Sequence, residues 1–255
     1  MLKLADERDL GKITEFCDCN VFGTYILCRA NAYGFEREFS KIWFSENHEK
    51  VDTVISSFDN NAVILTSDKT DFEELTFFVS AMGFASILTD CETARKCDIS
   101  GFSEKTIFAL KQRAVESSDE CISNPDLKAV YGLLCECFSR IYSDEKNGYL
   151  PWLSDYMFRS QRGYAHIRAA EKDGEFCSVA ITSAESKNAV VVGSVACKKA
   201  KRRKGFGKKA VLSLSNAALK DEKTVFAISE DEESSRFYEK IGFTEIGKAA
   251  YIERF

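Results

Sequence analysis

The sequence predicts an α+β fold in two domains, with helices flanking a mixed, mostly antiparallel central sheet. Strand-like and amphipathic runs alternate along the chain, and several neighbouring strand runs are joined by short turns. The 255 residues, 45% hydrophobic and 29% charged, suffice for two globular domains and exclude a disordered or fibrous chain. With only two prolines and 14 glycines, the chain has no room for a long flexible linker.

The first predicted domain, residues 1–118, opens with two helices, over residues 6–19 and 21–32. An amphipathic helix follows over residues 71–82, with Gly83 as its C-cap. Alternating and β-branched runs predict strands over residues 39–44, 51–58, 62–66, 84–88 and 106–110. The polar stretch at 116–123 predicts the domain boundary.

The second predicted domain, residues 119–255, has a helix capped by Asn124 with Pro125 in its first position, running to about residue 141. A second helix starts at Pro151. The remaining predicted elements are a hairpin of 164–170 and 176–182 around Asp173-Gly174, a strand over 189–197 buried on both faces, a helix over 207–220, a strand over 224–229, a helix over 234–241 and a strand over 243–251.

The cysteine spacing and the hydropathy of the sequence argue against a zinc protein and against a membrane-spanning protein. The ten cysteines are scattered, and the pairs Cys17/Cys19 and Cys135/Cys137 lack the C-x₂-C spacing of a zinc site, so we expect buried thiols and no metal. No apolar run approaches the roughly 18–20 residues of a membrane span, and the N-terminus lacks the apolar core of a signal peptide. We therefore expect a cytoplasmic protein without a membrane partner.

Positive charge is concentrated in one basic strip, residues 198–209, where eight of twelve side chains are Lys or Arg. The rest of the chain is acidic, so a local anionic ligand is indicated. The strip joins the predicted buried strand to a helix, and Gly205 and Gly207 lie at the start of that helix. Backbone N–H groups at a helix start, close to glycines and cations, favour phosphate binding.

Three other interpretations of the basic strip fit less well. A Walker loop needs Lys-Ser/Thr after its second glycine, where this chain has Lys208-Lys209. A dinucleotide fingerprint is met by Gly205-x-Gly207-x-x-Ala210, with Glu230 as the ribose acid, but seven residues separate the strand from its first glycine. A nucleic-acid site would need interleaved aromatics and a broad basic face, and only Phe206 interrupts the strip. We expect no nucleic-acid partner.

The chain resembles the GNAT acetyltransferase superfamily over about residues 125–255. Arg202-x-x-Gly205-x-Gly207 between strand and helix fits the family's R/Q-x-x-G-x-G/A loop for acetyl-CoA, and Tyr238-x-x-x-Gly242-Phe243 is similar to its Y-x-x-x-G-F ending. The helix and strand between the two motifs also match. The resemblance implies a GNAT-like acyl-CoA N-acyltransferase fold and acetyl-CoA as cosubstrate.

The resemblance also implies roles for particular residues. The amides and cations of the loop would bind the pyrophosphate, and the end of the strand would pair with the pantetheine arm. The coenzyme-binding residues implied are Val195, Ala196, Cys197, Arg202, Arg203, Lys204, Gly205, Phe206, Gly207, Lys208, Asp231 and Ser234. Gly193 predicts a bulge that turns an N–H toward the thioester carbonyl, or else a packing glycine.

Tyr238 is implied as the catalytic acid for the CoA thiolate; the other interpretation is a core tyrosine. The chain departs from the family where it has Asp231 instead of Asn, and no carboxylate lies within residues 189–197. Glu230, Asp231 or a water chain could then serve as base. Tyr149, Trp152 and Tyr156 are candidates for lining the acceptor site, at least half of them as core. His166 has no nucleophilic motif beside it to form a triad.

The predicted function is an enzyme that transfers acetyl from acetyl-CoA to a primary amine of a small-molecule or peptide-like acceptor. The alternative is a non-catalytic CoA-binding relative. Residues 51–88 repeat the order of elements around the basic strip, but the connection at 67–70 has neither glycine nor cationic strip. The N-terminal half is therefore interpreted either as a degenerate GNAT-like domain or as an unrelated α+β domain, in a monomer or homodimer.

Overall fold

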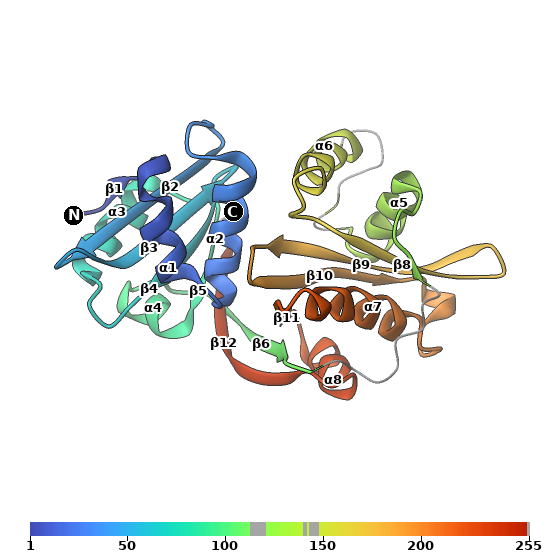
Figure 1. The fold of residues 1–255 in the computed structure, drawn as a ribbon. Coiled ribbons are helices and arrows are strands. Elements are labelled where there is room, and N and C mark those ends of the chain that lie inside the picture. The colour runs from blue at the N-terminus through green and yellow to red at the C-terminus, as the bar shows by residue number, and fades with distance from the viewer. Residues whose placement is uncertain (113–120, 140–141, 143–147, 254–255) are drawn as a thin grey trace. The chain divides into compact units, whose positions relative to one another are not determined.

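A computed structural model describes residues 1–112, 121–139, 142 and 148–253 of the protein (Figure 1). The chain divides into two compact units. The first comprises Met1–Phe108, Ile228–Ser235 and Glu245–Phe255, and the second comprises Ala109–Ala227 and Arg236–Thr244. The boundary predicted at 118/119 falls outside the described residues and stays a prediction.

The first unit is built on antiparallel strands followed by a parallel crossover. β2 pairs with β1 and β3, and β3 pairs with β4, all antiparallel; β4 then pairs in parallel with β5 across helix α3. Its elements are β1 (Lys3–Leu4), η1 (Glu7–Asp9), α1 (Leu10–Cys17), α2 (Val21–Tyr33), β2 (Ser40–Asn47), β3 (Lys50–Phe58), β4 (Asn61–Thr66), α3 (Phe72–Met82), β5 (Ser86–Asp90) and α4 (Cys91–Lys96), continued by β6 (Ser103–Leu110).

Local sequence explains where these helices begin and end. The Asn20 side chain accepts from the amides of Phe22 and Gly23 and caps α2. Gly83 ends α3 in the left-handed conformation, with φ of +59°, as predicted. Helix α4, six residues long and capped by Asp90, was not predicted, because so short an element leaves no periodic pattern.

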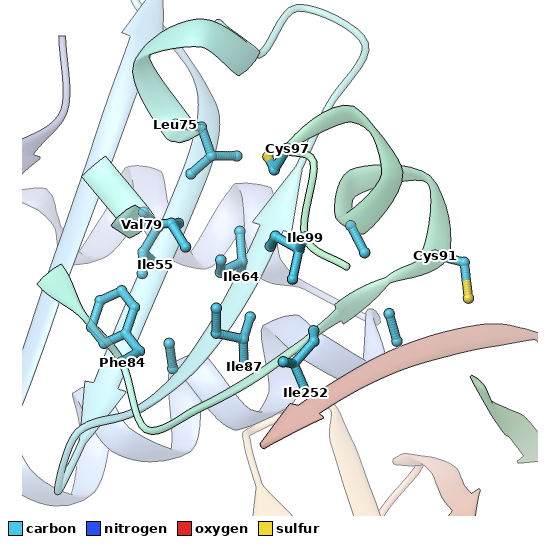
Figure 2. Close-up of a cluster of buried hydrophobic side chains, with 13 residues drawn as sticks. Ile55, Ile64, Leu75, Val79, Phe84, Ile87, Cys91, Cys97, Ile99 and Ile252 are labelled. Carbon is cyan, nitrogen blue, oxygen red and sulfur yellow. The ribbon is translucent and has the colours of Figure 1, made fainter. Parts of the chain in front are cut away.

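The core of the first unit includes the C-terminal end of the chain. Ile55, Ile64 and Ile87 from the strands pack against Leu75 and Val79 of α3 (Figure 2). β12 (Thr244–Glu253) pairs antiparallel with β5, and its Ile252, 4% exposed, belongs to the same cluster. The last strand therefore completes a core whose other members lie more than a hundred residues earlier.

The second unit has the same arrangement. β7, β8, β9 and β10 pair antiparallel in that order, and β10 pairs in parallel with β11 across α7. In Figure 1, α5 and α6 lie on one face of these strands and α7 on the other. Its elements are β7 (Cys121–Ile122), α5 (Leu127–Cys137), α6 (Tyr149–Ser160), β8 (Ile167–Lys172), β9 (Glu175–Glu185), β10 (Ala189–Cys197), η2 (Lys199–Lys201) and α7 (Phe206–Lys220), followed by β11 (Thr224–Ser229) and α8 (Glu232–Lys240), which continue into segments of the first unit.

Both helix starts predicted from proline positions are wrong. Helix α6 begins at Tyr149, two residues before Pro151. Asp126, and not Asn124, caps α5, because the Asp126 carboxylate accepts from the Lys128 amide at 3.0 Å. Pro125 therefore precedes the helix. The predicted end near residue 141 lies outside the described residues.

The order of elements is the same in the two halves. Each half begins with a short strand and two helices. Three antiparallel strands follow, the first of which pairs with the short strand. A crossover helix then leads to a strand that pairs in parallel with the third of these. The sheet orders β1-β2-β3-β4-β5 and β7-β8-β9-β10-β11 correspond, as the interpretation of the N-terminal half as a degenerate copy of the GNAT-like domain requires.

None of the ten cysteines, all of which lie within the described ranges, forms a disulfide; five are buried, four are half-buried and Cys19 is exposed. The expectation of small buried hydrophobes therefore holds for half of them. Within the described ranges, no helix combines the length and apolar character needed to cross a membrane.

Candidate functional site

The strand β10 loses one of its partners halfway along its length. It pairs with β11 from Ala189 to Val192, and its remaining residues continue beside β9 alone in the described ladders. Gly193, Ser194 and Val195 are half-buried, although this strand was predicted to be buried on both faces. The prediction was wrong for these three residues and for Cys197, which is also half-buried, because the described pairing with β11 along this edge of β10 ends at Val192. The backbone of an open strand edge can pair with an extended ligand.

A β-bulge accompanies the change of partner, as predicted at Gly193. From Gly193 to Ala196, β10 advances by three residues while β9 advances by two, so one residue of β10 is extra. A Cβ at Gly193 would clash with Ser183 Oγ, so this glycine also allows the Ser183 side chain to pack closely against it. Both interpretations of Gly193 therefore apply.

Helix α7 begins without a side-chain cap in the described part of the chain. Gly205 occupies its N-cap with φ of +86°, and Arg203 before it has φ of +59°. The first helical hydrogen bond joins the Lys209 amide to the Gly205 carbonyl, so the amides of Phe206, Gly207 and Lys208 precede the regular ladder. The Gly207 amide interacts with the Cys197 thiol, which is only a weak acceptor. This helix end can exchange that contact for a phosphate oxygen.

Acidic side chains are absent from the first turn of α7, and cations surround its start. Some of those cations have protein partners: Glu175 pairs with Lys201 at 2.5 Å and with Lys198 at 3.4 Å. The bond from Lys201, followed by the one from Lys198, lowers the pKa of the Glu175 carboxyl. Arg202 Nε donates to the Cys197 carbonyl at 3.2 Å, which folds its side chain back onto the end of β10.

Gly207 has open space on its side-chain face. A Cβ there would meet only the Phe237 ring, at 3.8 Å, which is ordinary contact. The protein alone therefore does not require glycine at this position. A ligand that approaches the backbone closely would require it.

Tyr238 lies in helix α8 and is 5% exposed. Its ring packs edge-on against Phe237 and tilted against Phe243, with centroids 5.4 and 5.3 Å apart. The packing suits a core tyrosine, and its predicted role as an acid stays a prediction.

Asp231 and Ser234 bind each other at the start of α8, within a segment of the first unit. The Asp231 carboxylate accepts from the Ser234 amide and hydroxyl, both at 2.8 Å, and these bonds lower its pKa. A carboxylate held in this way is a poor base. Neighbouring Glu230 is exposed and pairs with Lys105 at 2.7 Å. The predicted contacts of Asp231 and Ser234 with the coenzyme stay predictions.

Aromatic side chains of α5 and α6 form one cluster of tilted and stacked rings. Tyr131 packs against Tyr149 and Trp152, and Trp152 stacks on Tyr156 with 5.7 Å between centroids. Tyr156 is buried, whereas Tyr149 and Trp152 are half-buried. Sequence reasoning missed Tyr142, whose hydroxyl reaches Ser194 Oγ on the bulge at 2.8 Å. The two residues lie 52 positions apart, and no local pattern links them.

The described residues outside the basic strip hold neither a catalytic triad at Glu185 nor a metal site. Buried Glu185 accepts from His166 and Lys223, at 2.8 and 2.5 Å, and no nucleophile completes a triad among their described contacts. No three His, Cys, Asp or Glu side chains gather into a metal site among the residues that the structure describes.

The equivalent place in the first unit has the opposite electrostatics. Helix α3 follows β4 as α7 follows β10, but Asp71 caps it, accepting from the amides of Glu73 and Glu74 at 3.1 and 3.0 Å. Glu73 and Glu74 also place two acidic side chains in its first turn. This helix start is already occupied by a carboxylate and would repel a phosphate.

Comparison with known proteins identifies the fold. Residues 176–252 match the family model described as FR47-like protein. The fold is that of the GNAT N-acetyltransferases, including tandem GNAT proteins, so the predicted resemblance and fold class are confirmed. No curated protein sequence matches the chain.

Several solved structures share this fold over nearly the whole chain. A GNAT-family acetyltransferase from Colwellia psychrerythraea is 12% identical, with 100% of each chain covered and a TM-score of 0.59. A GCN5-related N-acetyltransferase from Sphaerobacter thermophilus is 12% identical over 98% of this chain and 94% of its own, with a TM-score of 0.61. A tandem GNAT protein from the clavulanic acid biosynthesis pathway is 11% identical over 98% and 97%, with a TM-score of 0.62.

Proposed function

We propose that this protein is an N-acetyltransferase that transfers the acetyl group of acetyl-CoA to a primary amine of a small-molecule or peptide-like acceptor by direct attack. The observation that carries the proposal is the uncapped start of α7, which has a left-handed glycine, cations and no acidic side chain. It lies directly after a half-exposed strand edge. The two features together suit a long ligand with a phosphate end and an extended amide arm.

The coenzyme would lie along both features. Amides of residues 203–208 and the cations of the basic strip would hold the pyrophosphate. Val195, Ala196 and Cys197 would pair through their backbone with the pantetheine arm. The Cys197 thiol would stay protonated beside it, because burial raises the pKa of that thiol.

The chemistry requires that the amine lose a proton and that the departing thiolate gain one. We assign the second step to the Tyr238 hydroxyl, and an N–H at the β10 bulge would stabilise the oxyanion. Asp231 is a weak candidate for the base, since its carboxylate is held by Ser234. A water chain is then the better candidate.

A second candidate function is non-catalytic binding of CoA. It is favoured by the absence of any carboxylate on β10 and by the burial of Tyr238. Replacing Tyr238 by Phe separates the two functions. If Tyr238 is the acid, the variant binds acetyl-CoA normally and turns over more slowly, by about 10²–10⁴-fold. An unchanged rate would exclude that role.

Binding is tested first, by calorimetry with acetyl-CoA on wild type and Gly207→Ala. The added methyl fits the protein but enters the space of the ligand, so we expect the dissociation constant to rise at least about tenfold. Gly11→Ala is the matched control, because Gly11 holds the same second helical position in α1 and has no atom within 4 Å of the added Cβ. Equal effects of the two variants, or no binding to wild type, would contradict the proposal.

Activity is tested with a panel of primary amines and acetyl-CoA, following acetylated product by mass spectrometry. Product with at least one amine is expected from wild type. Binding of acetyl-CoA without any product would favour the non-catalytic function instead.

A further inference from the structure

The bulge of β10 holds a serine in a backbone conformation that favours glycine. Ser194 has φ of +45° and is half-buried beside Gly193, where the ladder to β9 shifts register. A residue with a Cβ is disfavoured there, and such strain is concentrated at functional sites. Gly193 next to it has an ordinary φ, so the left-handed position carries a hydroxyl.

The hydroxyl of Tyr142, whose ring packs against Tyr131 of α5, is directed at this serine. The Tyr142 hydroxyl lies 2.8 Å from Ser194 Oγ. The Tyr142 ring is held by Tyr131, at 5.9 Å and edge-on, and by Phe138, at 6.2 Å. The pair is therefore fixed on one side by aromatic packing and on the other by the strand.

The strand beside the bulge is held in place by α6. Arg159 is fixed to Asp155 by two hydrogen bonds, at 2.8 and 3.0 Å. Its other nitrogen reaches the carbonyl oxygens of Thr182 and Ser183, at 3.5 and 3.4 Å. Ser183 is the residue whose hydroxyl covers Gly193. Tyr142, the neighbouring strand β9 and Arg159 of α6 together fix the geometry around Ser194.

The hydroxyls of Tyr142 and Ser194 can form hydrogen bonds in addition to the one between them. One O–H lies between the two oxygens, which leaves one further proton and several lone pairs for a third group. Burial raises the pKa of the Tyr142 phenol, so the pair stays neutral at physiological pH. A neutral pair of this kind can accept from an amine N–H, but it cannot serve as a phenolate base.

We propose that Ser194 Oγ, oriented by Tyr142, accepts a hydrogen bond from the acceptor amine and places its nitrogen at the bulge. This inference rests on the proposed function and adds a substrate-contacting residue to it. Tyr142 is a positioning residue, since it acts through Ser194. The reaction itself needs no new step.

The test combines Tyr142→Phe, Ser194→Ala and the double variant, assayed with acetyl-CoA and the primary amine that gives the highest wild-type rate. Each single variant should raise the KM for the amine about three- to tenfold, the loss expected for one hydrogen bond. Because the bond is made before and during reaction, kcat should change little. The double variant should lose little more than either single one.

Two controls separate this role from a structural one. The dissociation constant for acetyl-CoA should stay within about twofold of wild type, which a collapsed bulge would not allow. Ser215→Ala deletes a buried hydroxyl in α7 of the same unit and should leave the KM for the amine unchanged. If Ser194→Ala does not fold, Ser194→Gly replaces it, because glycine adopts φ of +45° freely.

Folded variants with an unchanged KM for the amine would overturn the inference while leaving the proposed function intact. Fully additive effects of the two substitutions would also overturn it, since Tyr142 would then act independently of Ser194. Failure of wild type to bind acetyl-CoA or to acetylate any amine would instead overturn the proposed function and this inference with it.

Discussion

Gly205 determines how α7 starts, because it occupies the N-cap with φ of +86° and has no side chain of its own to cap the helix amides. We predict that Gly205→Asp weakens acetyl-CoA binding at least about tenfold. Its carboxylate would compete for the helix start as Asp71 does in α3. Gly205→Asn is the control, since Asn tolerates left-handed backbone equally and carries no charge. Calorimetry on both variants measures the difference, and equal losses would show that the added side chain acts through capping or backbone strain and not through its charge.

Glu175 competes with the predicted ligand for two cations of the basic strip. Its pKa is lowered from an ordinary value of 4.5 by Lys201 and Lys198, so the carboxylate is fully charged at pH 7. We predict that Glu175→Gln tightens acetyl-CoA binding by about two- to fivefold at low salt, with less effect at high salt.

Glu171→Gln makes the same change of charge on the same hairpin, at an exposed position, and should have a smaller effect. The comparison is made by titrating both variants at two salt concentrations. Equal tightening by both would mean that net charge, and not the Lys198 and Lys201 pairs, limits affinity.

The elements α3 and α7 show how one topology can hold two different helix starts. Each follows a strand and leads into a parallel partner, but α3 begins with a capping carboxylate and α7 with an uncapped glycine. We therefore predict one molecule of acetyl-CoA bound per chain, although both halves share the order of elements. Calorimetry or native mass spectrometry measures this stoichiometry. A value of two would mean that α3 binds in spite of Asp71.

Long elements and their turns could be predicted from the sequence, because their signals are local. The strand at residues 224–229 and the hairpin turn at Asp173-Gly174 were placed correctly, and both turn residues have positive φ. Short elements such as β1 and β7 contain two residues each and carry no period. The basic strip and its glycines are a local pattern from which a phosphate site could be predicted, whereas the Tyr142–Ser194 contact depends on tertiary packing and could not be predicted.

At the scale of the whole chain, sequence order and compact units do not coincide. Ile228–Ser235 and Glu245–Phe255 belong to the same compact unit as the N-terminal residues, although residues of the second unit precede each of them in the chain. Strand pairing over such separations leaves no trace in local hydropathy, because β12 alternates in the same way whichever partner it has. The correspondence between the two halves was visible only as a faint repeat of element order.

The chain's last strand should therefore stabilise its first unit. Ile252 is 4% exposed and lies in the core shown in Figure 2. We predict that Ile252→Ala, which leaves a cavity there, lowers the free energy of unfolding by about 2–5 kcal/mol. Ile246→Ala on the same strand, where the side chain is 50% exposed, should cost well under about 1 kcal/mol. Hydrogen exchange should accelerate at the amides of β5, which pairs with β12, in the first variant only. If protection of β5 were unchanged in Ile252→Ala, the C-terminal strand would not be part of that core in solution.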